Sequence, residues 1–463
     1  MLVGLALTVT APPLVVAQST PAMASYFTIL QPRFIDPDFK PAHLSATIAS
    51  PDLNLDGHAD LVVFGSHPPP LGPPNATPPG RVYFGDGMGG FTAPPAGVFP
   101  TGSLGAIGPK TLLVEDFNRD GRKDLFLATC GFDVNPWPGE QNRLFLSDGD
   151  TWRDASSELP ALNDFTHGAA AGDLSGRGII DIIASNGYIQ RDLSYTLVNS
   201  GSGRFAMTRA NLPLGAGETM DTVSAHRFGG VSLADLNGDS LPDLVVLAEG
   251  SNNNLRNRRT VILWNRSGVF SETDKTVLPA PAVFGENQIA LDAQAIDVNG
   301  DNLADLVIAG TQGQPTYYGG WFVQVLINRG AKQFTDETST RIPAEDSHFR
   351  TETAGMASWP KVMRVLDFNH DSVMDFSFEY VHNSGSVSPE LPLLWINDGA
   401  GQFAALKVKD FVPAGSESRL GTFHLMPTQH GYSVITPRYD AATGGFRITG
   451  MMATRRYLGH PGR

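Results

Sequence analysis

Short, nearly continuous apolar runs recur along the chain, and each one follows directly after a cluster of acidic residues. The runs occupy residues 61–64, 125–127, 179–183, 244–247 and 306–308. Apolar runs of this length without regular polar alternation are typical of strands that are buried on both faces. The pattern therefore predicts strands inside a layered structure, where neighbouring sheets cover both faces.

Each run belongs to a longer unit with a fixed order. A stretch such as 43–48 or 111–114 leads into the acidic cluster, and the buried run follows it. A third stretch, such as 82–84 or 261–264, precedes a tight turn that ends in an aromatic residue, often as Gly-x-Phe. Glycine permits the positive φ of tight turns, and the aromatic side chain can fill the space between neighbouring sheets. Each unit is therefore predicted to hold four strands.

The acidic cluster of the second unit shows the chemistry most clearly. Asp116, Asn118, Asp120 and Asp124 stand at positions 1, 3, 5 and 9 of one short loop. Oxygens at this spacing can converge on one point, which suits a hard cation that prefers about six to eight oxygen ligands. Carboxylates held within about 4 Å repel by up to ~4 kcal/mol per pair at an effective dielectric constant of about 20. We therefore predict that Ca²⁺ is bound in the loop.

The same loop occurs six times, and we number the copies in chain order as the first to the sixth acidic loop. The other complete copies are Asp52, Asn54, Asp56 and Asp60 (first); Asp235, Asn237, Asp239 and Asp243 (fourth); Asp297, Asn299, Asp301 and Asp305 (fifth); and Asp367, Asn369, Asp371 and Asp375 (sixth). From one first Asp to the next, the steps are 64, 57, 62, 62 and 70 residues. Such a period indicates a repeat architecture.

The third acidic loop has lost a ligand. It reads Asp173, Ser175, Arg177 and Asp181, with an arginine where the central carboxylate stands in the other copies. We predict that the guanidinium pairs with Asp173 and Asp181, so that a tethered positive charge takes the place of the ion.

Four-stranded units repeated about an axis are typical of a β-propeller. We predict an all-β, seven-bladed propeller, with six clear repeats and a degenerate seventh at about 420–456. The loop of this seventh unit, 428–431, has no acidic residue. An additional strand near 27–34 is expected to complete the seventh blade, because such a clasp joins both ends of the chain and leaves no sheet edge exposed.

The acidic loops and Gly-x-Phe turns resemble the FG-GAP/VCBS repeats of integrin α-subunit headpieces and of many secreted bacterial proteins. The resemblance covers roughly residues 43–450 and implies an integrin-α-like propeller with about five Ca²⁺ sites. It also implies that the residue at position 7 contributes its backbone carbonyl, which adds His58, Arg122, Leu241, Leu303 and Val373 to the metal-binding residues. Ser240, Asn302 and Ser372 replace the family's Gly at position 6. The fourth and sixth sites are therefore expected to be less secure.

Two other interpretations of the loops are weaker. An EF-hand requires a bidentate Glu at position 12 and flanking helices, whereas position 12 is Leu127 or Val246 within a predicted strand. Asp and Asn also favour ordinary turns. The alternative that these residues only form ordinary turns is disfavoured, because five copies have nearly identical spacing.

Composition and charge narrow the function classes. The 463-residue chain carries a formal net charge of −14, which argues against a nucleic-acid partner. Cys130 is its single cysteine, so no intramolecular disulfide is possible. Residues 1–24 are predicted to be a signal peptide, although a basic segment is missing, and residues 25–463 a single propeller domain. We expect no membrane span and a secreted, cell-surface or periplasmic location.

A ligand is expected on the rim opposite the calcium loops, where the long connections between second and third strands gather. The ligand would be a protein or a carbohydrate. The predicted ligand-binding residues are Trp137, Arg256, Arg258, Tyr317, Tyr318 and Trp321.

Signatures of an enzyme are few. His43, His167, His226 and His348 precede predicted first strands and are candidates for a cluster at the axis. The sequence has no His-x-x-x-His pair, Gly-x-Ser-x-Gly elbow or phosphate loop, and we assign no catalytic residue. The leading prediction is a calcium-binding module for adhesion or carbohydrate recognition. The alternative is an extracellular lyase or hydrolase of polysaccharides, which a deep axial pocket with paired titratable groups would favour.

Overall fold

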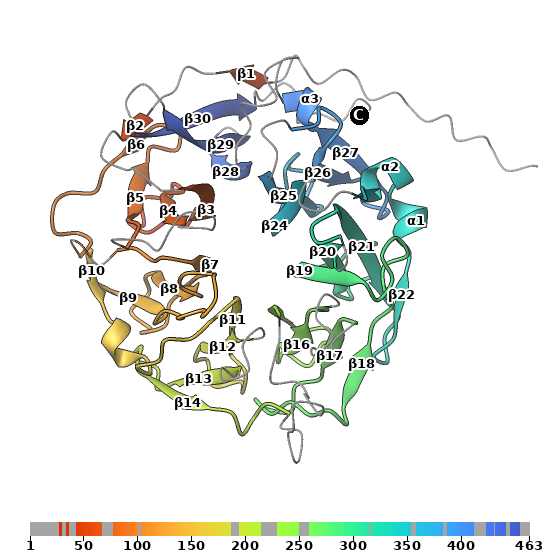
Figure 1. Ribbon diagram of the computed structural model, residues 1–463, viewed down its shortest axis with the longest axis horizontal. Coiled ribbons are helices and arrows are strands. Elements are labelled where there is room, and N and C mark those ends of the chain that lie inside the picture. The colour runs from red at the N-terminus through yellow and green to blue at the C-terminus, as the bar shows by residue number, and fades with distance from the viewer. Residues whose placement is uncertain are drawn as a thin grey trace, which may run out of the picture.

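Antiparallel strands dominate the computed structural model, which describes residues 27–29, 34–36, 43–66, 77–100, 102, 104–186, 194–213, 229–249, 259–313, 316–352, 358–382, 387–411, 423–429, 431–440 and 445–453. Within these residues the strands form seven sheets. Six of the sheets each contain four consecutive strands and stand around a common axis (Figure 1). This arrangement is a β-propeller, so the predicted all-β propeller fold is confirmed for these six blades.

The blades are named here by their order in the chain. Blade 1 contains β3 (His43–Ala49), β4 (Leu61–Ser66), β5 (Gly80–Gly85) and β6 (Phe91–Thr92). Blade 2 contains β7 (Pro109–Glu115), β8 (Asp124–Thr129), β9 (Arg143–Asp148) and β10 (Thr151–Asp154). Blade 3 contains β11 (Gly168–Gly172), β12 (Asp181–Ser185), β13 (Tyr195–Asn199) and β14 (Phe205–Thr208). Blade 4 contains β15 (Val231–Ala234), β16 (Asp243–Val246), β17 (Val261–Leu263) and β18 (Lys275–Val277). Blade 5 contains β19 (Gln288–Ile296), β20 (Asp305–Gln312), β21 (Gly320–Asn328) and β22 (Phe334–Asp336), and β23 (His348–Arg350) also pairs with β21. Blade 6 contains β24 (Ser358–Leu366), β25 (Asp375–His382), β26 (Pro392–Asn397) and β27 (Phe403–Lys407).

Within the described residues the helical segments are short. They are the 3-10 turn η2 (Ser156–Glu158) and the helices α1 (Thr338–Arg341), α2 (Ala344–Ser347) and α3 (Val408–Phe411). Figure 1 places α1, α2 and α3 at the outer edge of the ring. Across the described ranges, we find no helix that combines the length and the apolar character of a membrane span.

The second strands of blades 1 to 5 are buried along their whole length, as the apolar runs predict. Every residue of β4, β8, β12, β16 and β20 is buried. These strands lie in the middle of their sheets, and the neighbouring blades cover both faces. The apolar contacts that stabilise the fold therefore lie between blades.

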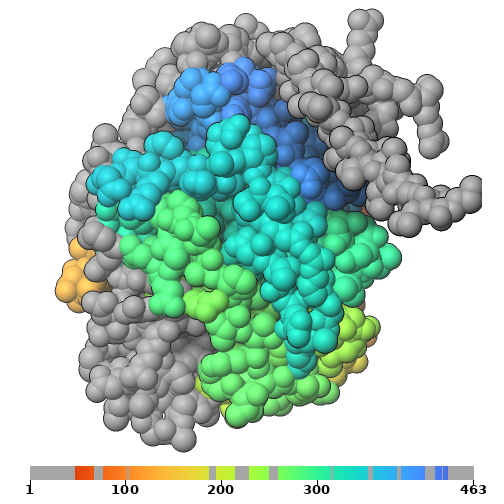
Figure 2. Space-filling view, turned by 90° about the vertical axis from the view of Figure 1, so that its right-hand side faces the viewer, coloured from red at the N-terminus to blue at the C-terminus, as the bar shows by residue number. Residues whose placement is uncertain are grey.

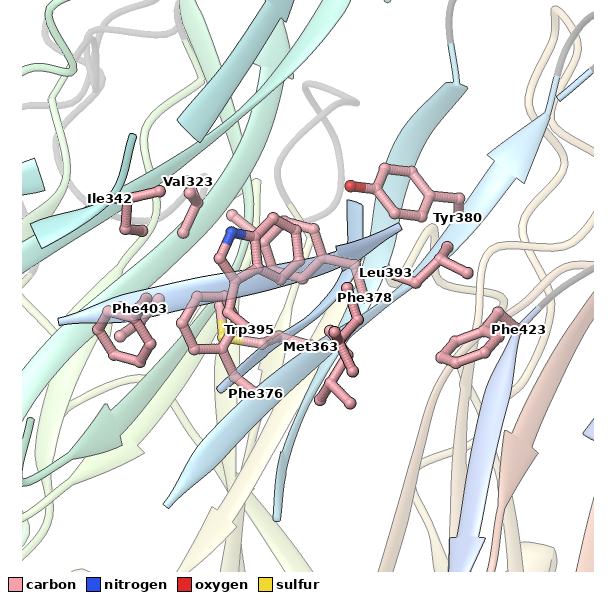
Figure 3. Close-up of a cluster of buried hydrophobic side chains, with 14 of the residues drawn as sticks. Val323, Ile342, Met363, Phe376, Phe378, Tyr380, Leu393, Trp395, Phe403 and Phe423 are labelled. Carbon is pink, nitrogen blue, oxygen red and sulfur yellow. The ribbon is translucent and has the colours of Figure 1, made fainter. Parts of the chain in front are cut away.

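The largest core cluster shows how two blades join (Figure 3). Trp395 of β26 stacks on Phe376 of β25, with 4.9 Å between ring centroids. Trp321, from blade 5, meets the same indole edge-on at 6.3 Å. Figure 2 shows blades 4 to 6, coloured green to blue, packed side by side along this flank of the molecule.

The seventh sheet combines both ends of the described chain. It contains β28 (His424–Thr428), β29 (Gly431–Asp440) and β30 (Gly445–Ala453), together with β1 (Phe27–Ile29) and β2 (Phe34–Asp36). Both N-terminal strands pair antiparallel with β30, with Thr28 opposite Met452 and Ile35 opposite Arg447.

This sheet contacts a blade on each side. Leu425 and Val434 belong to the core cluster of blade 6. Met426 and Ile435 pack instead with residues of blade 1. Between the two clusters, the buried His424 ring has its Nδ1 2.7 Å from Glu379 Oε1 of blade 6 and its Nε2 2.5 Å from Ser50 Oγ, directly after β3.

Candidate functional site

Each of the six acidic loops joins the first strand of its blade to the second. The second loop, for example, runs from Asp116, directly after β7, to Asp124, the first residue of β8. All six loops therefore lie on one rim of the propeller. Strands flank every loop, so the EF-hand interpretation is wrong.

A left-handed backbone at positions 4 and 6 gives the loops their shape. In the second loop, Arg119 has φ 65° and Gly121 has φ 86°. The non-glycine residues at position 6 adopt the same conformation, with φ 68° for Ser240, 64° for Asn302 and 70° for Ser372. Loss of the glycine therefore does not change the turn, although a side chain in this region costs about 1–2 kcal/mol.

Side-chain oxygens hold the turn by accepting backbone hydrogen bonds. In the second loop, Asp116 accepts the N–H groups of Asp120 at 3.1 Å and of Gly121 at 2.9 Å. Asn118 Oδ1 accepts the N–H of Asp120 at 2.9 Å, and Asp120 accepts the N–H of Arg122, also at 2.9 Å. Equivalent bonds recur in the first, fourth, fifth and sixth loops. Positions 1, 3 and 5 are thus turned toward the inside of one small ring.

The carboxylate at position 9 is buried and anchors the loop to the sheet. In the fifth loop, Asp305 accepts the N–H of Val298 at 2.9 Å and the N–H of Asn328, at the end of β21, at 2.7 Å. Burial raises the pKa of these carboxyl groups, and nearby Asp residues add to the rise in five of the six, the exception being Asp124. The pKa is about 6 for Asp60, Asp243 and Asp305 and about 7 for Asp375, and it is also raised for Asp124 and Asp181.

The third loop contains its own cation. Arg177 Nη2 donates to both carboxylate oxygens of Asp181 at 2.9 Å, and its Nε donates to Ser175 Oγ at 2.6 Å. Asp173 accepts the backbone N–H groups of Arg177 and Gly178 instead. The predicted ion pair is therefore present with Asp181, whereas Asp173 is held by the backbone and not by the guanidinium.

The donor set of the other five loops suits Ca²⁺, because every donor is an oxygen. One atom in the first loop also supports a metal site, because Asp52 Oδ1 is buried and has no hydrogen-bond partner among the described residues. The three carboxylates of a loop do not all bring oxygens within 4.8 Å of one another in the described chain. Ca²⁺–oxygen bonds of 2.3–2.6 Å place oxygens on opposite sides of an ion up to about 5 Å apart, so this spacing is compatible with a Ca²⁺ site.

An asparagine at or just after the end of the third strand links each of the second to fifth loops to the blade that follows it, and sequence reasoning missed it. Asn328 Nδ2 donates to the carbonyl of Leu236, at position 2 of the fourth loop, at 2.8 Å. It also donates to Ala304 O at 3.0 Å. Asn199, Asn265 and Asn397 donate in the same way to Phe117, Leu174 and Val298 of the preceding loops. The recurrent Asn shortly before the glycine turn was the available signal.

A cavity of about 760 Å³ lies on the propeller axis and is lined by residues of the first strands β3, β7, β11, β15, β19 and β24. Its lining includes residues at the start of first strands, such as Gly108 and Gly168, and residues at the end of second strands, such as Ser66 and Cys130. Both kinds of position lie far from the acidic loops. The cavity therefore reaches the side of the opposite rim, where a ligand was predicted, and it also extends along the first strands toward the acidic loops, as far as Ala171 and Leu233.

Titratable groups of blades 2 and 3 meet in this cavity. Lys110 Nζ lies 3.4 Å from Asp133 Oδ2, and His167 Nε2 lies 4.0 Å from the same oxygen. Cys130, Asp133 and His167 each bring a ligand atom within 4.8 Å of the others, and no other such group of Asp, Glu, His or Cys occurs in the described ranges. Burial raises the pKa of Cys130 to about 11 and lowers that of His167.

Other charged groups reach the cavity from blades 5 and 6. Lys361 Nζ donates to Thr47 Oγ1 at 3.1 Å, and burial lowers the pKa of Lys361 to about 8. Burial also raises the pKa of Asp292 to about 6, although Asp292 accepts the Met363 N–H at 2.8 Å. Tyr318 lies against Trp359, with ring centroids 4.7 Å apart.

The predicted ligand-binding residues lie in different parts of the structure. Tyr318 lines the cavity, Tyr317 lies beside it, and Trp137 is exposed on the connection after β8. Trp321 is only 3% exposed and packs in the core, so its predicted binding role is wrong. Arg256 and Arg258 lie outside the described residues.

Of the four histidines considered as candidates for an axial cluster, at least one lies elsewhere. His167 lines the cavity, whereas His348 belongs to β23, which pairs with β21 at the other side of blade 5. His226 and the side chain of His43 lie outside the described residues.

Six blades around an axis, each with an oxygen-rich loop between its first and second strands, define a repeat β-propeller of the acidic-loop type. The FG-GAP-like repeat profile matches residues 52–127, 116–184, 235–308 and 297–377, which together span more than half of the chain. The chain therefore belongs to the FG-GAP-like repeat family.

The chain is also similar to two solved structures of BBS1N in complex with ARL6DN. The lead-soaked crystal gives a TM-score of 0.45 at 8% identity over 92% of this chain and 97% of that chain. The mercury-soaked crystal gives 0.41 at 10% identity over 94% and 99%. A comparison with curated proteins finds no match.

Proposed function

We propose that this protein is a Ca²⁺-stabilised propeller that acts as an extracellular binding module, with its ligand on the rim opposite the calcium loops. The observation that carries the calcium part is the contrast between the loops. Five copies gather oxygen donors alone, whereas the third places a guanidinium 2.9 Å from its buried Asp181. A positive charge thus replaces the ion in the copy that lacks the central carboxylate.

The calcium proposal is tested by titration calorimetry on chelator-treated protein. We expect about five Ca²⁺ ions per chain, and a sixth in Arg177→Asp, because the substitution removes the tethered charge and restores the ligand. Arg177→Lys is the matched control, which keeps the charge and should keep the wild-type stoichiometry. Wild-type protein that binds no Ca²⁺, or an Arg177→Asp variant with unchanged stoichiometry, contradicts the proposal.

We also propose that the seventh sheet is a seventh blade that closes the ring. Its strands β28 and β29 lie between blade 6 and blade 1, and His424 contacts a residue on each side. The pairing of β1 and β2 with β30 supports a closure in which both ends of the chain share one sheet.

The ligand is proposed to be a carbohydrate or a protein segment. The Tyr318–Trp359 pair supports this, because aromatic faces stack on sugars and on apolar side chains. Glycan-array and peptide-array binding, with wild type compared with Trp359→Ala, tests the assignment. Trp137→Ala is the control on an exposed loop. Binding that survives Trp359→Ala unchanged would move the ligand away from the cavity.

A second candidate function is cleavage of a polysaccharide by a lyase or hydrolase. The specific observation that favours it is the axial cavity with Lys110 and Asp133 in hydrogen-bond reach at 3.4 Å. Product analysis on every glycan that binds distinguishes the two functions: intact glycan supports a binding module, and shortened or unsaturated products support the enzyme.

Secretion is proposed as well, with residues 1–24, which lie outside the described residues, as a signal peptide. Expression of the full chain in a secreting host, followed by N-terminal sequencing of the exported protein, tests this. Exported protein that begins near residue 25 supports the proposal, and retention inside the cell contradicts it.

A further inference from the structure

We propose that the axial cavity contains a site for a borderline-soft divalent metal ion such as Zn²⁺, with Cys130, Asp133 and His167 as its three protein ligands. This site is separate from the acidic loops, which lie on the opposite rim. Each of the three residues lines the cavity, and their ligand atoms lie within 4.8 Å of one another.

The backbone brings the three ligands together from two blades. Cys130 follows β8 directly, and its N–H donates to Gly108 O at 2.9 Å. Thr166 N–H donates to Thr129 O at 3.3 Å, which sets the residues that follow them, Cys130 and His167, side by side. Stacking on Phe165, with 4.6 Å between ring centroids, orients the His167 ring.

The framework around Cys130 is also fixed by buried hydrogen bonds. Glu140 accepts Thr129 Oγ1 at 2.6 Å and the Ile107 N–H at 2.9 Å. Thr129 N–H in turn donates to Asn142 Oδ1 at 2.9 Å. The strand end that carries Cys130 is therefore held in place before any ion binds.

One sulfur, one imidazole nitrogen and one carboxylate oxygen form a donor set that suits Zn²⁺ and is a poor choice for Ca²⁺. Tetrahedral Zn²⁺ with bonds of about 2.0–2.3 Å spaces its donors roughly 3.3–3.8 Å apart. His167 Nε2 and Asp133 Oδ2 are already 4.0 Å apart. A contraction of at most about 1.5 Å brings the set to tetrahedral spacing, and a fourth position remains for water or a cavity ligand.

Lys110 is the cation that competes with this ion. Its Nζ lies 3.4 Å from Asp133 Oδ2, one of the proposed ligand atoms. Metal binding must displace this ammonium from the carboxylate and release the thiol proton of Cys130 to solvent, which leaves a metal–thiolate bond. Removing the Lys110 charge should therefore strengthen metal binding.

Cobalt titration of the full chain tests the site. The protein is reduced, treated with chelator and kept in excess Ca²⁺, and Co²⁺ is then added while absorbance is recorded. A thiolate-to-Co²⁺ charge-transfer band that saturates at one equivalent and disappears when Zn²⁺ is added supports the proposal. Cys130 is the single cysteine, so the band has one possible source.

Three variants sharpen the test. Cys130→Ser should abolish the band, and His167→Ala should weaken Co²⁺ binding at least ~10-fold. Lys110→Met should strengthen it at least ~10-fold, because a like charge is removed from the neighbourhood of the ion. His348→Ala, on β23 away from the cavity, is the matched control and should bind as wild type does.

Absence of a charge-transfer band in the wild type, or a Lys110→Met variant that binds no more tightly, overturns the proposal. The Lys110→Met arm keeps the test decisive if Cys130→Ser does not fold. Oxygen-only Co²⁺ binding in the acidic loops gives no thiolate band. A failure of the calcium proposal is therefore distinguishable from a failure of this one.

Discussion

At the scale of single residues, the acidic loops place strain at positions that the ligand pattern does not reveal. Positions 4 and 6 are both left-handed, and position 4 is Leu55, Arg119 or His370 in three of the copies. These residues accept an unfavourable backbone because the side chains at positions 1, 3 and 5 hold the turn by several hydrogen bonds. The loop is therefore determined by its oxygens more than by its glycines.

Ser372→Gly should stabilise the protein by about 0.5–1 kcal/mol, because it relieves a left-handed serine at some cost in unfolded-chain entropy. Gly121→Ala is the reciprocal variant. A new Cβ there meets no atom within 4 Å, so its expected loss of about 1–2 kcal/mol comes from φ alone. Urea unfolding in chelator measures both changes. A Ser372→Gly variant less stable than wild type would refute the strain argument.

At the scale of elements, the third-strand asparagines connect blades 3 to 6 to the acidic loop of the preceding blade. The Asn328 side-chain amide donates to the carbonyls of Leu236 and Ala304, and its backbone N–H donates to the buried Asp305 carboxylate. One residue thus ties the end of β21 to two acidic loops. Short polar contacts thereby join the fourth and fifth loops.

Asn328→Ala should lower the free energy of unfolding by about 1–3 kcal/mol, because two carbonyls lose their donor in a largely buried place. The urea midpoint, measured in Ca²⁺ and in chelator, checks this. Gln402→Ala, at an exposed turn position, is the control and should stay within about 0.5 kcal/mol of wild type. Equal stabilities of the two variants would show that the link is dispensable.

At the scale of the whole molecule, the junction between the seventh sheet and its two neighbours depends on a buried ion pair. Glu379 lies 2.9 Å from Arg364 Nε and 2.7 Å from His424 Nδ1. Burial alone would raise the pKa of this carboxyl, but Arg364 and His424 outweigh burial and lower the pKa to about 2. The ionised form is therefore favoured in the folded protein.

Since the folded pKa lies below the ordinary value of 4.5, Glu379 contributes stability above about pH 4.5 that is lost as the pH falls through about 2. The contribution is on the order of 3 kcal/mol. Wild type should exceed Glu379→Gln by this margin at pH 7, and the difference should shrink toward pH 2. Glu286→Gln, at an exposed position, is the control. A difference that does not change with pH contradicts the assignment.

The proposed closure of the ring by the N-terminal strands is tested by deletion. Removing residues 1–36 takes away β1 and β2 and exposes the edge of β30, so we expect a clear drop in melting temperature. Removing residues 1–24 alone keeps both strands and serves as the control. Identical melting curves for the two deletions would rule out the clasp.

The acidic loops and buried strands could be predicted from the sequence because the residues that form each of them lie within a single repeat. Asp116 to Asp124 form their turn through bonds within one loop, and the run 125–127 is buried because it follows that loop into the middle of a sheet. Spacing and apolar pattern were therefore sufficient for the propeller, its loops and the rim on which they lie.

Contacts between blades were decided only by the tertiary structure. Trp321 and Tyr318 are close in sequence and both aromatic, yet one packs in the core and the other lines the cavity. Cys130 and His167 become neighbours only because two blades meet at the axis, and Asn328 finds its partners 92 and 24 residues away. A repeat specifies the hydrogen bonds within its own loop, but the contacts that its residues make with other blades depend on how the blades pack around the axis.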